Sequence, residues 1–356
     1  MRAITVLPGI KNSARLEDMA EPEPSQGAVL VETIALGVCG TDREIVAGLY
    51  GAPPPGQQRL ILGHELLGRV ADAPRESGLR RDDIVVGIVR HPDPVPCPAC
   101  ATGEWDMCRN GRYTEHGIKE RHGFGAERFR IEPEFAVKVD PALGIVAILM
   151  EPASIVAKAW DQVGAIGRRS QPWRPQNFLV TGAGPIGLLA ALMGAQRKLQ
   201  VHVFDRNTSG PKPALIRDVG GKHHSDVASL RDLQFDIVME CTGAAAVIVE
   251  SMGRCAPSGI VCLLGVSVPG TKIEFDIGAF NRKAVLNNEV VFGSVNANLR
   301  HYRAAADTLT RADKAWLERL ISRRVPLARW QDALEHRHGD IKVIIDFGQR
   351  AHGDEN

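Results

Sequence analysis

The sequence predicts an α/β protein of two domains, one rich in strands and one built on a doubly wound parallel sheet. The chain has 356 residues, which exceeds one ordinary hydrophobic core. Residues 1–36 alternate apolar and polar side chains between Pro and Gly turns, a pattern typical of half-buried strands. From residue 177 to about 294, nearly continuous apolar strands instead alternate with helical segments, which indicates a parallel sheet covered on both faces.

The charge balance and the chain ends exclude several classes of partner. Lys and Arg number 43 against 42 Asp and Glu, without a basic block, so we expect neither nucleic acid nor a membrane surface as a partner. The N-terminal stretch lacks the apolar core of a signal peptide, and no run reaches the ~18 apolar residues that a membrane span needs. Seven cysteines without an extracellular signal indicate a reducing compartment. We therefore expect a soluble, cytoplasmic protein.

A glycine-rich stretch organises the second domain. It follows a predicted buried strand at 178–180 and precedes an apolar helix, with Gly182, Gly184 and Gly187 in G-x-G-x-x-G spacing. These glycines allow a tight turn, close approach of a pyrophosphate and packing of the helix on the strand. A second strand ends at Asp205, 18 residues after Gly187, where a carboxylate accepts hydrogen bonds from an adenosine ribose. The stretch therefore predicts a dinucleotide site, and a glycine-rich loop without a ligand is the alternative.

Four residues in the first half of the chain are candidate metal ligands. Cys39, His64 and Glu65 are ligand types that zinc accepts together. Glu151 and Pro152 open a mostly apolar helix, where a buried carboxylate needs a partner and a metal ion would be one. A single cysteine or histidine is more often a core residue, and the scatter of these residues along the sequence leaves that alternative open.

Three further cysteines cluster in a loop rich in Pro and Gly. The spacing Cys97-x2-Cys100-x7-Cys108 is typical of part of a structural zinc site, which needs four ligands. The fourth cysteine is missing, so either Asp93 supplies an oxygen or this lobe holds no metal. Three cysteines in the predicted sheet and helices are interpreted as packing residues: Cys241, Cys255 and Cys262.

Histidines outside the predicted metal site are interpreted as surface residues more readily than as ligands or cleft residues. His116 and His122 lie in a glycine-rich loop, where exposure is more common than a place in a cleft. The same interpretation applies to four histidines in expected loops or helix ends: His223, His224, His336 and His338.

The order of the motifs resembles a known superfamily over essentially the whole chain. G-V-C-G-T-D at 37–42, G-H-E at 63–65, the cysteine lobe, M-E-P at 150–152 and V-T-G-A-G-P-I-G at 180–187 resemble the zinc-dependent medium-chain alcohol dehydrogenases. Within this superfamily, three segments are similar to the glucose (aldose) 1-dehydrogenase branch: NGRYTEHGIKERHGFGAERF (110–129), EPEFAVKV (132–139) and VVFGSVNANLRHY (290–302).

This resemblance implies a fold and an assembly. It implies a GroES-like β-rich catalytic domain at 1–173, a Rossmann domain with a doubly wound parallel sheet at 174–297, and a segment at 298–356 that rejoins the catalytic domain. The active site is then expected in the cleft between the two domains. Dimers or tetramers of identical chains are expected through edge-to-edge joining of the Rossmann sheets.

The resemblance also implies roles for individual residues. Thr41 matches the hydroxyl of a proton relay, and Glu115 and Asn296 match positions that hold sugar hydroxyls or lie near the nicotinamide. Glu65 is either a direct zinc ligand or a carboxylate that sets the charge around the metal. The catalytic zinc ligands are expected at Cys39, His64, Glu65 and Glu151. The cofactor contacts are expected at Gly182, Gly184, Pro185, Ile186, Gly187, Asp205, Arg206, Thr242, Gly265 and Asn296.

The sequence departs from the family pattern at two places. Pro94 stands where the first cysteine of the lobe would fall, which leaves zinc at Cys97, Cys100 and Cys108 open. Related sugar dehydrogenases often present a small or amide residue before paired arginines that accept a 2′-phosphate, whereas this chain has Asp205 before Arg206. The Asp205 carboxylate favours NAD, and Arg206 favours some use of NADP. We therefore expect Zn²⁺ and NAD, with NADP as a measurable second cofactor.

These expectations together predict an oxidoreductase. We expect zinc-dependent oxidation of an aldose, such as glucose, at C1 to the lactone, with hydride transfer to NAD(P). A polyol or secondary-alcohol dehydrogenase would share every zinc residue and is the alternative enzyme. A zinc-free quinone reductase is disfavoured because it does not need the candidate ligands. A non-catalytic nucleotide-binding regulator is the alternative from another class.

Overall fold

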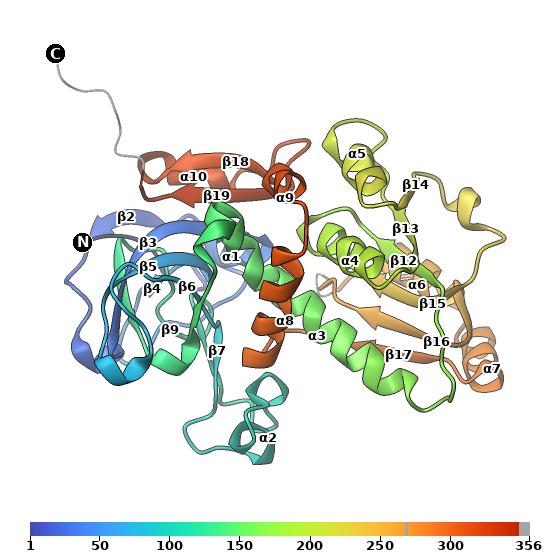
Figure 1. The fold of residues 1–356 in the computed structure, drawn as a ribbon, viewed down its shortest axis with the longest axis horizontal. Coiled ribbons are helices and arrows are strands. Elements are labelled where there is room, and N and C mark those ends of the chain that lie inside the picture. The colour runs from blue at the N-terminus through green and yellow to red at the C-terminus, as the bar shows by residue number, and fades with distance from the viewer. Residues whose placement is uncertain (268–269, 349–356) are drawn as a thin grey trace. The chain divides into compact units, whose positions relative to one another are not determined.

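The computed structural model describes residues 1–267 and 270–348, and the chain folds into two units, each with its own core (Figure 1). Unit 1 combines Met1–Ser154 with the chain from Asn296 onward, and unit 2 is Ile155–Val295. Helix α3 (Met150–Gly167) therefore begins in unit 1 and continues into unit 2. The domain boundaries predicted at 173 and 297 stay a prediction.

Unit 1 contains the β-rich part that the N-terminal alternation predicts. Its largest sheet has the strand order β11-β6-β5-β3-β19-β18, and β10 pairs with β3. Strand β3 (Val29–Val38) is central because its alternating apolar residues enter the core, where Val29, Val31 and Ala35 are fully buried. The other strands of this sheet are β5 (Glu65–Asp72), β6 (Ile84–Gly87), β10 (Arg128–Ile131), β11 (Ala136–Lys138), β18 (Ile321–Pro326) and β19 (Lys342–Asp346).

Two small sheets and several helices complete the description of unit 1. The sheet β2-β1-β4 comprises β2 (Arg15–Asp18), β1 (Arg2–Val6) and β4 (Leu60–Ile61). The sheet β7-β8-β9 comprises β7 (Arg90–His91), β8 (Thr114–His116) and β9 (Glu120–Arg121). The α-helices are α1 (Gly40–Val46), α2 (Pro98–Ala101), α8 (Leu299–Thr310), α9 (Lys314–Leu320) and α10 (Trp330–Leu334).

The last strand returns to the first part of the chain, as its apolar sequence predicts. Strand β19 pairs antiparallel with β3, with Val343 opposite Val38, and parallel with β18. Figure 1 shows the red strands β18 and β19 beside the blue N-terminal strands. This register brings Lys342 to the end of β3, where the chain turns into α1.

Unit 2 is the predicted doubly wound parallel sheet. Its order is β14-β13-β12-β15-β16-β17, and every neighbouring pair is parallel. The strands are β12 (Asn177–Thr181), β13 (Gln200–Phe204), β14 (Lys222–His224), β15 (Phe235–Glu240), β16 (Cys255–Leu263) and β17 (Val290–Gly293). The helices between them are α4 (Pro185–Gln196), α5 (Pro211–Asp218), α6 (Ala245–Gly253) and α7 (Ile277–Asn287). The fold class predicted from the sequence is confirmed.

The interpretation of two histidines needs correction. His223 and His224 were expected in a solvated loop, but they lie in edge strand β14 and are partly buried, because β14 pairs with β13. The helical segment Pro141–Gly167 has 27 residues and contains an 18-residue window with a mean hydropathy of 1.7, but Glu151, Lys158 and Asp161 interrupt its apolar residues. This window is 78% buried inside the protein, which is typical of a core helix.

Candidate functional site

The candidate catalytic metal site lies where β3, β5 and the loop before β5 meet. Cys39 is the N-cap of α1 directly after β3, and His64 and Glu65 stand at the start of β5. The Sγ of Cys39 lies 3.1 Å from Nε2 of His64, and one ligand atom each of Cys39, His64 and Glu65 lies within 4.8 Å of the others. Gly37 pairs with Glu65 across the sheet, and a Cβ at Gly37 would approach Oε2 of Glu65 to 2.0 Å.

Asp42 orients the two ligands at the beginning of α1. Its Oδ2 accepts the backbone N–H of Cys39 at 2.9 Å, and its Oδ1 lies 3.4 Å from Nδ1 of His64 without the alignment of a hydrogen bond. Burial alone would lower the pKa of His64, but the Cys39 sulfur and the Asp42 carboxylate outweigh it and raise that pKa well above its usual range. Sequence reasoning missed Asp42, although a carboxylate three residues after Cys39 in a helical first turn is the signal for it.

Lys342 clamps Glu65 from β19. Its Nζ lies 2.6 Å from both carboxylate oxygens of Glu65, and both side chains are almost completely buried. Burial would lower the pKa of Lys342, but the negative charge of Glu65 outweighs it and raises that pKa. Lys342 was also missed from the sequence; its signal was a lysine in the otherwise apolar strand IKVIIDF.

Glu151 is buried in the first turn of α3 but is not part of the group of three ligands within 4.8 Å. Burial raises the pKa of Glu151 to about 7, and the charge of Glu65 adds to this effect. Cys39, His64, Glu65 and Glu151 offer the sulfur, nitrogen and oxygen donors that zinc takes. The Nδ1 of His64 and Oδ1 of Asp42 are enclosed and have no hydrogen-bond partner among the described residues, so polar groups of this centre are left for a further partner. The donor set therefore fits zinc.

The two predicted substrate residues lie together. The Nδ2 of Asn296 donates to Oε1 of Glu115 at 2.6 Å, and Asn296 adopts a positive φ of 65° that non-glycine residues rarely take. The Nε of Arg90 donates to the same Glu115 oxygen at 3.0 Å. Thr41 lies in the first turn of α1, two residues after Cys39, and is partly buried. Sequence reasoning missed Arg90.

The second cysteine cluster is also assembled. The Sγ atoms of Cys97, Cys100 and Cys108 lie within 4.8 Å of one another. The backbone N–H groups of Arg109 and Cys100 point at the Cys97 sulfur and lower the pKa of Cys97 to about 6, whereas burial raises the pKa of Cys100 to about 11.

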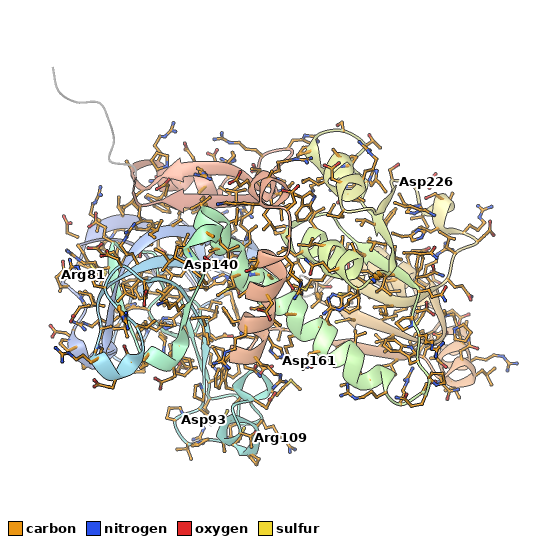
Figure 2. All side chains as sticks on the ribbon, in the orientation of Figure 1. Arg81, Asp93, Arg109, Asp140, Asp161 and Asp226 are labelled. Carbon is orange, nitrogen blue, oxygen red and sulfur yellow. The ribbon has the colours of Figure 1, made fainter. Side chains whose placement is uncertain are left out.

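Asp93, the proposed fourth ligand of that cluster, accepts hydrogen bonds from other residues instead. Figure 2 shows Asp93 and Arg109 in the lobe that contains α2. The Oδ1 of Asp93 accepts the N–H of Val95 at 2.8 Å, and its Oδ2 accepts Nδ2 of Asn110 at 2.8 Å and Nε of Arg112 at 3.3 Å. The described residues therefore supply three thiols in this lobe and no free carboxylate from Asp93.

The loop histidines are not surface residues, which corrects their interpretation. His116 is 4% exposed, donates from Nδ1 to the carbonyl of His122 at 2.7 Å and stacks on Phe124. His122 accepts the N–H of Ile61 and bonds Gln57, and it is partly buried. Burial lowers the pKa of His116 to about 3. His116 is buried and His122 partly buried because residues 123 and 124 hydrogen-bond to the segment that leads to His64.

In unit 2, the three glycines have the geometry that a pyrophosphate loop requires. Gly182 has a φ of 89°, and a Cβ at Gly187 would approach the carbonyl oxygen of Gly182 to 1.8 Å. A Cβ at Gly184 would meet no atom of the protein, although Gly184 is the N-cap of α4. Turn geometry and packing account for Gly182 and Gly187, while the space beside Gly184 is open to a ligand at the start of α4.

Asp205 holds this glycine loop. Its Oδ2 accepts the N–H of Ala183 at 2.7 Å, and its Oδ1 accepts the N–H of Asn207 at 2.9 Å. Burial would raise the pKa of Asp205, but these hydrogen bonds outweigh it and lower that pKa. Lys212, at the beginning of α5, has its Nζ 3.9 Å from Oδ2 of Asp205.

A buried carboxylate that sequence reasoning missed joins the neighbouring loops. Glu240, fully buried at the end of β15, accepts the N–H groups of Thr242 and Gly243 and the hydroxyl of Thr181. Gly265 packs against this turn, where a Cβ would lie 2.0 Å from the nitrogen of Gly243. Thr242 and Gly265 thus belong to loops at the carboxyl ends of adjacent parallel strands, the edge at which doubly wound sheets bind ligands.

Comparisons with known proteins agree with these two units. The model for the alcohol dehydrogenase GroES-like domain matches residues 25–141, and the model described as glucose dehydrogenase C-terminus matches residues 144–347. Glucose 1-dehydrogenase 2 of Vulcanisaeta moutnovskia is 39% identical over 98% of this chain and 100% of its own. Glucose 1-dehydrogenase of Thermoproteus tenax is 39% identical over 97% of this chain and 99% of its own.

A solved structure is similar over the same range. Haloferax mediterranei glucose dehydrogenase, in complex with NADP, Zn and gluconolactone, has a TM-score of 0.89 and 32% identity, covering 98% of this chain and 100% of the other. A GroES-like unit with a buried zinc-type donor set, together with a dinucleotide-type sheet, defines a zinc-dependent medium-chain dehydrogenase. The chain belongs to this superfamily and, within it, to the glucose dehydrogenase branch.

Proposed function

We propose that this protein oxidises an aldose such as glucose at C1 to the lactone, with zinc and a nicotinamide dinucleotide. The observation that carries the proposal is the cluster of partly buried Cys39 with buried His64 and Glu65, whose ligand atoms lie within 4.8 Å of one another. Relatives named glucose 1-dehydrogenase, and the relative that holds gluconolactone, support glucose as the substrate. The proposed ligands are Cys39, His64, Glu65 and Glu151.

The residues of the chain would divide the reaction between them. Bound zinc would supply a Lewis acid that makes the C1 hydroxyl more acidic, as it does for water, whose pKa falls from ~16 to about 7. Thr41 would carry the proton from that hydroxyl towards solvent, and a bound nicotinamide would supply the acceptor for the hydride from C1. Glu115 and Asn296 would hold hydroxyls remote from C1 and so orient the sugar. Asp42 and Lys342 would keep His64 and Glu65 in place.

The test is a spectrophotometric scan of nicotinamide reduction. Aldoses, sorbitol and simple secondary alcohols are compared, each with NAD and NADP, with and without a chelator. Oxidation of aldoses that is lost with the chelator and restored by Zn²⁺ is expected. Preference for sorbitol or a simple alcohol would favour the alternative dehydrogenase, and absence of any turnover despite nucleotide binding would favour a regulator.

For the cofactor, we propose a preference for NAD with measurable use of NADP. The Asp205 carboxylate opposes a 2′-phosphate, while Arg206 and the nearby Lys212 reduce this opposition. The NADP in the Haloferax structure argues against the preference, so the test must be direct. Asp205→Ala should raise the ratio of kcat/KM with NADP to kcat/KM with NAD about tenfold. Arg206→Ala and Lys212→Met should each lower this ratio. A wild-type enzyme at least about tenfold more efficient with NADP would contradict the proposal.

The proposal includes a homodimer or homotetramer in the cytoplasm. Strand β17 is at the edge of the unit 2 sheet, and α7 beside it in sequence buries none of its residues. Ile277, Val285 and Leu286 of this helix are about two-thirds exposed, which is unusual for large apolar side chains. Edge-to-edge pairing of two β17 strands would cover them. Light scattering of wild-type protein and of Leu286→Glu measures the assembly.

A further inference from the structure

The carboxylate of Glu115 is bonded on one side only. Its Oε1 accepts from Nε and Nη2 of Arg90, both at 3.0 Å, and from Nδ2 of Asn296 at 2.6 Å. Within residues 1–267 and 270–348, no donor bonds Oε2. This atom is also not among the enclosed polar atoms that lack a partner, although Glu115 as a whole is 4% exposed. One carboxylate oxygen is therefore saturated and the other faces accessible space.

Arg90 is itself held on three sides. Its guanidinium lies 3.7 Å from the centre of the Tyr113 ring, and its Nη1 donates to the carbonyl of Asp106 at 3.3 Å. Arg90 pairs with Glu115 in the β7–β8 ladder and is 7% exposed. The Asp106 side chain is fixed in turn by Nδ2 of Asn298 at 2.7 Å. A guanidinium enclosed by a ring, a carbonyl and a carboxylate has little freedom to rotate.

We propose that Arg90 is a positioning residue for the substrate, and that it selects sugars through Glu115. Arg90 and Asn296 saturate Oε1 and thereby fix Oε2 as the acceptor for one substrate hydroxyl remote from C1. This inference rests on the proposed function and assigns a new residue to it. In this proposal Arg90 acts on the substrate through Glu115.

The chemistry of the pair explains why an arginine suits this position. A buried carboxylate needs a cation to remain charged, and a charged acceptor makes a stronger hydrogen bond than a neutral one. The planar guanidinium of Arg90 donates two N–H groups to Oε1 of Glu115, and this contact fixes the direction in which Oε2 points. An analogue that lacks the bonded hydroxyl would leave Oε2 desolvated without a donor, which costs about 100-fold in kcat/KM.

The kinetic test compares glucose with its single-deoxy analogues. Wild-type enzyme should reject one analogue about 100-fold relative to glucose in kcat/KM. Arg90→Met should lose about tenfold or more of that discrimination and raise KM more than it lowers kcat, because the lost contact is remote from C1. Arg90→Lys, which keeps the charge and one donor, should regain part of it. Glu115→Gln should lose as much discrimination between glucose and the deoxy analogue as Arg90→Met does. The double variant should lose no more discrimination than either single variant.

A matched control is available on the next strand. Arg121 on β9 bonds Thr114 and pairs with Glu132 at 3.4 Å, so Arg121→Met removes an arginine–carboxylate pair from the same small sheet. It should leave discrimination between glucose and the deoxy analogue unchanged. Binding of the nicotinamide cofactor, followed by fluorescence, should also be unchanged in Arg90→Met.

A thermal cycle tests the pair without any substrate. Arg90→Met leaves the buried Glu115 unpaired and should lower Tm by about 5 °C or more. Adding Glu115→Gln should recover more than half of that loss. A loss that Glu115→Gln does not reduce, or unchanged discrimination in an Arg90→Met enzyme that oxidises glucose, overturns the inference alone. A wild-type protein that oxidises no aldose overturns the proposed function and, with it, this inference.

Discussion

The two cysteine-containing clusters of unit 1 are alike in spacing and different in surroundings. In each, three potential ligand atoms lie within 4.8 Å of one another. Around Cys39 the neighbours are charged and enclosed: Asp42 faces His64, and Lys342 is paired with Glu65. Around Cys97 the neighbours are backbone N–H groups, and the nearest proposed carboxylate, Asp93, is bonded to other residues.

This is the difference that we expect between a catalytic zinc site and an incomplete structural one. A catalytic zinc ion needs protein ligands, an open position and a second layer of groups that orient the ligands. The cluster at Cys39 has such a layer. A structural zinc ion needs four closed ligands, and the cluster at Cys97 offers three thiols. Proximity of ligand types alone therefore does not distinguish the two; the groups behind the ligands do.

The largest expected effect is on turnover at the first cluster. Cys39→Ala should lower kcat/KM at least about 1,000-fold, because it removes the only sulfur donor of the predicted catalytic site. Binding of the nicotinamide cofactor, measured by fluorescence, should be retained. Cys100→Ser makes the matched cysteine substitution in the lobe and should change kcat/KM less than about threefold. Near-wild-type activity of Cys39→Ala would refute the zinc mechanism.

The next effect is on stability. Lys342→Met leaves Glu65 buried without its cation and should lower the free energy of unfolding by about 3 kcal/mol or more, measured by urea denaturation. Adding Glu65→Gln should restore much of it. In the lobe, Arg112 is mostly exposed beside Asp93, so Arg112→Met should cost less than about 1 kcal/mol. Equal losses for the two methionine variants would remove the distinction between the clusters.

A smaller effect concerns thiol reactivity in protein stripped of metal by a chelator. With a pKa of about 6, Cys97 is mostly thiol at pH 5 and mostly thiolate at pH 7, so its alkylation should accelerate about tenfold over this interval. Cys100, with a pKa of about 11, should stay unreactive. Mass spectrometry of iodoacetamide-treated peptides identifies the modified residue. Equal labelling of Cys97 and Cys100 at pH 7 would contradict the assignment of the thiolate to Cys97.

The smallest expected effect concerns the zinc content, which distinguishes one zinc ion per chain from two. Because both carboxylate oxygens of Asp93 already accept hydrogen bonds from other residues, elemental analysis of the purified protein should give about one zinc ion per chain. That ion should be lost in Cys39→Ala and kept in Cys100→Ser. Two ions per chain, with one lost in Cys100→Ser, would show that the lobe completes its shell with a ligand other than Asp93.

Local patterns in the sequence predicted the fold and the positions of the main clusters. Gly182, Gly184 and Gly187 are interpretable because a turn, a ligand approach and a helix contact all act within a few residues. The partners behind the ligands were not predicted. Lys342 meets Glu65 only because β19 pairs with β3, a register decided by packing of the whole sheet. The zinc ligand roles themselves stay a prediction.

Burial of polar loops was equally hard to predict. His116 was expected in an exposed glycine-rich loop, yet it ends strand β8 and stacks on Phe124, whose segment hydrogen-bonds to the residues before His64. Arg90 was not recognised for the same reason, since its partner Glu115 lies 25 residues away on another strand. Asp205 was placed correctly at a strand end, but the contacts of its carboxylate with Ala183 and Asn207 depend on loop geometry.

The pairing of Glu65 with Lys342 has a consequence for the order in which the protein is made. The two residues are 277 positions apart, so a ribosome adding about 5–20 residues per second synthesises Lys342 roughly 15–55 s after Glu65. Unit 2 is fully synthesised within this interval, whereas unit 1 still lacks its β18 and β19 strands. During this time the nascent chain carries Cys39, His64 and an uncompensated Glu65. The charge balance of the metal site is thus completed only with the last strand to leave the ribosome.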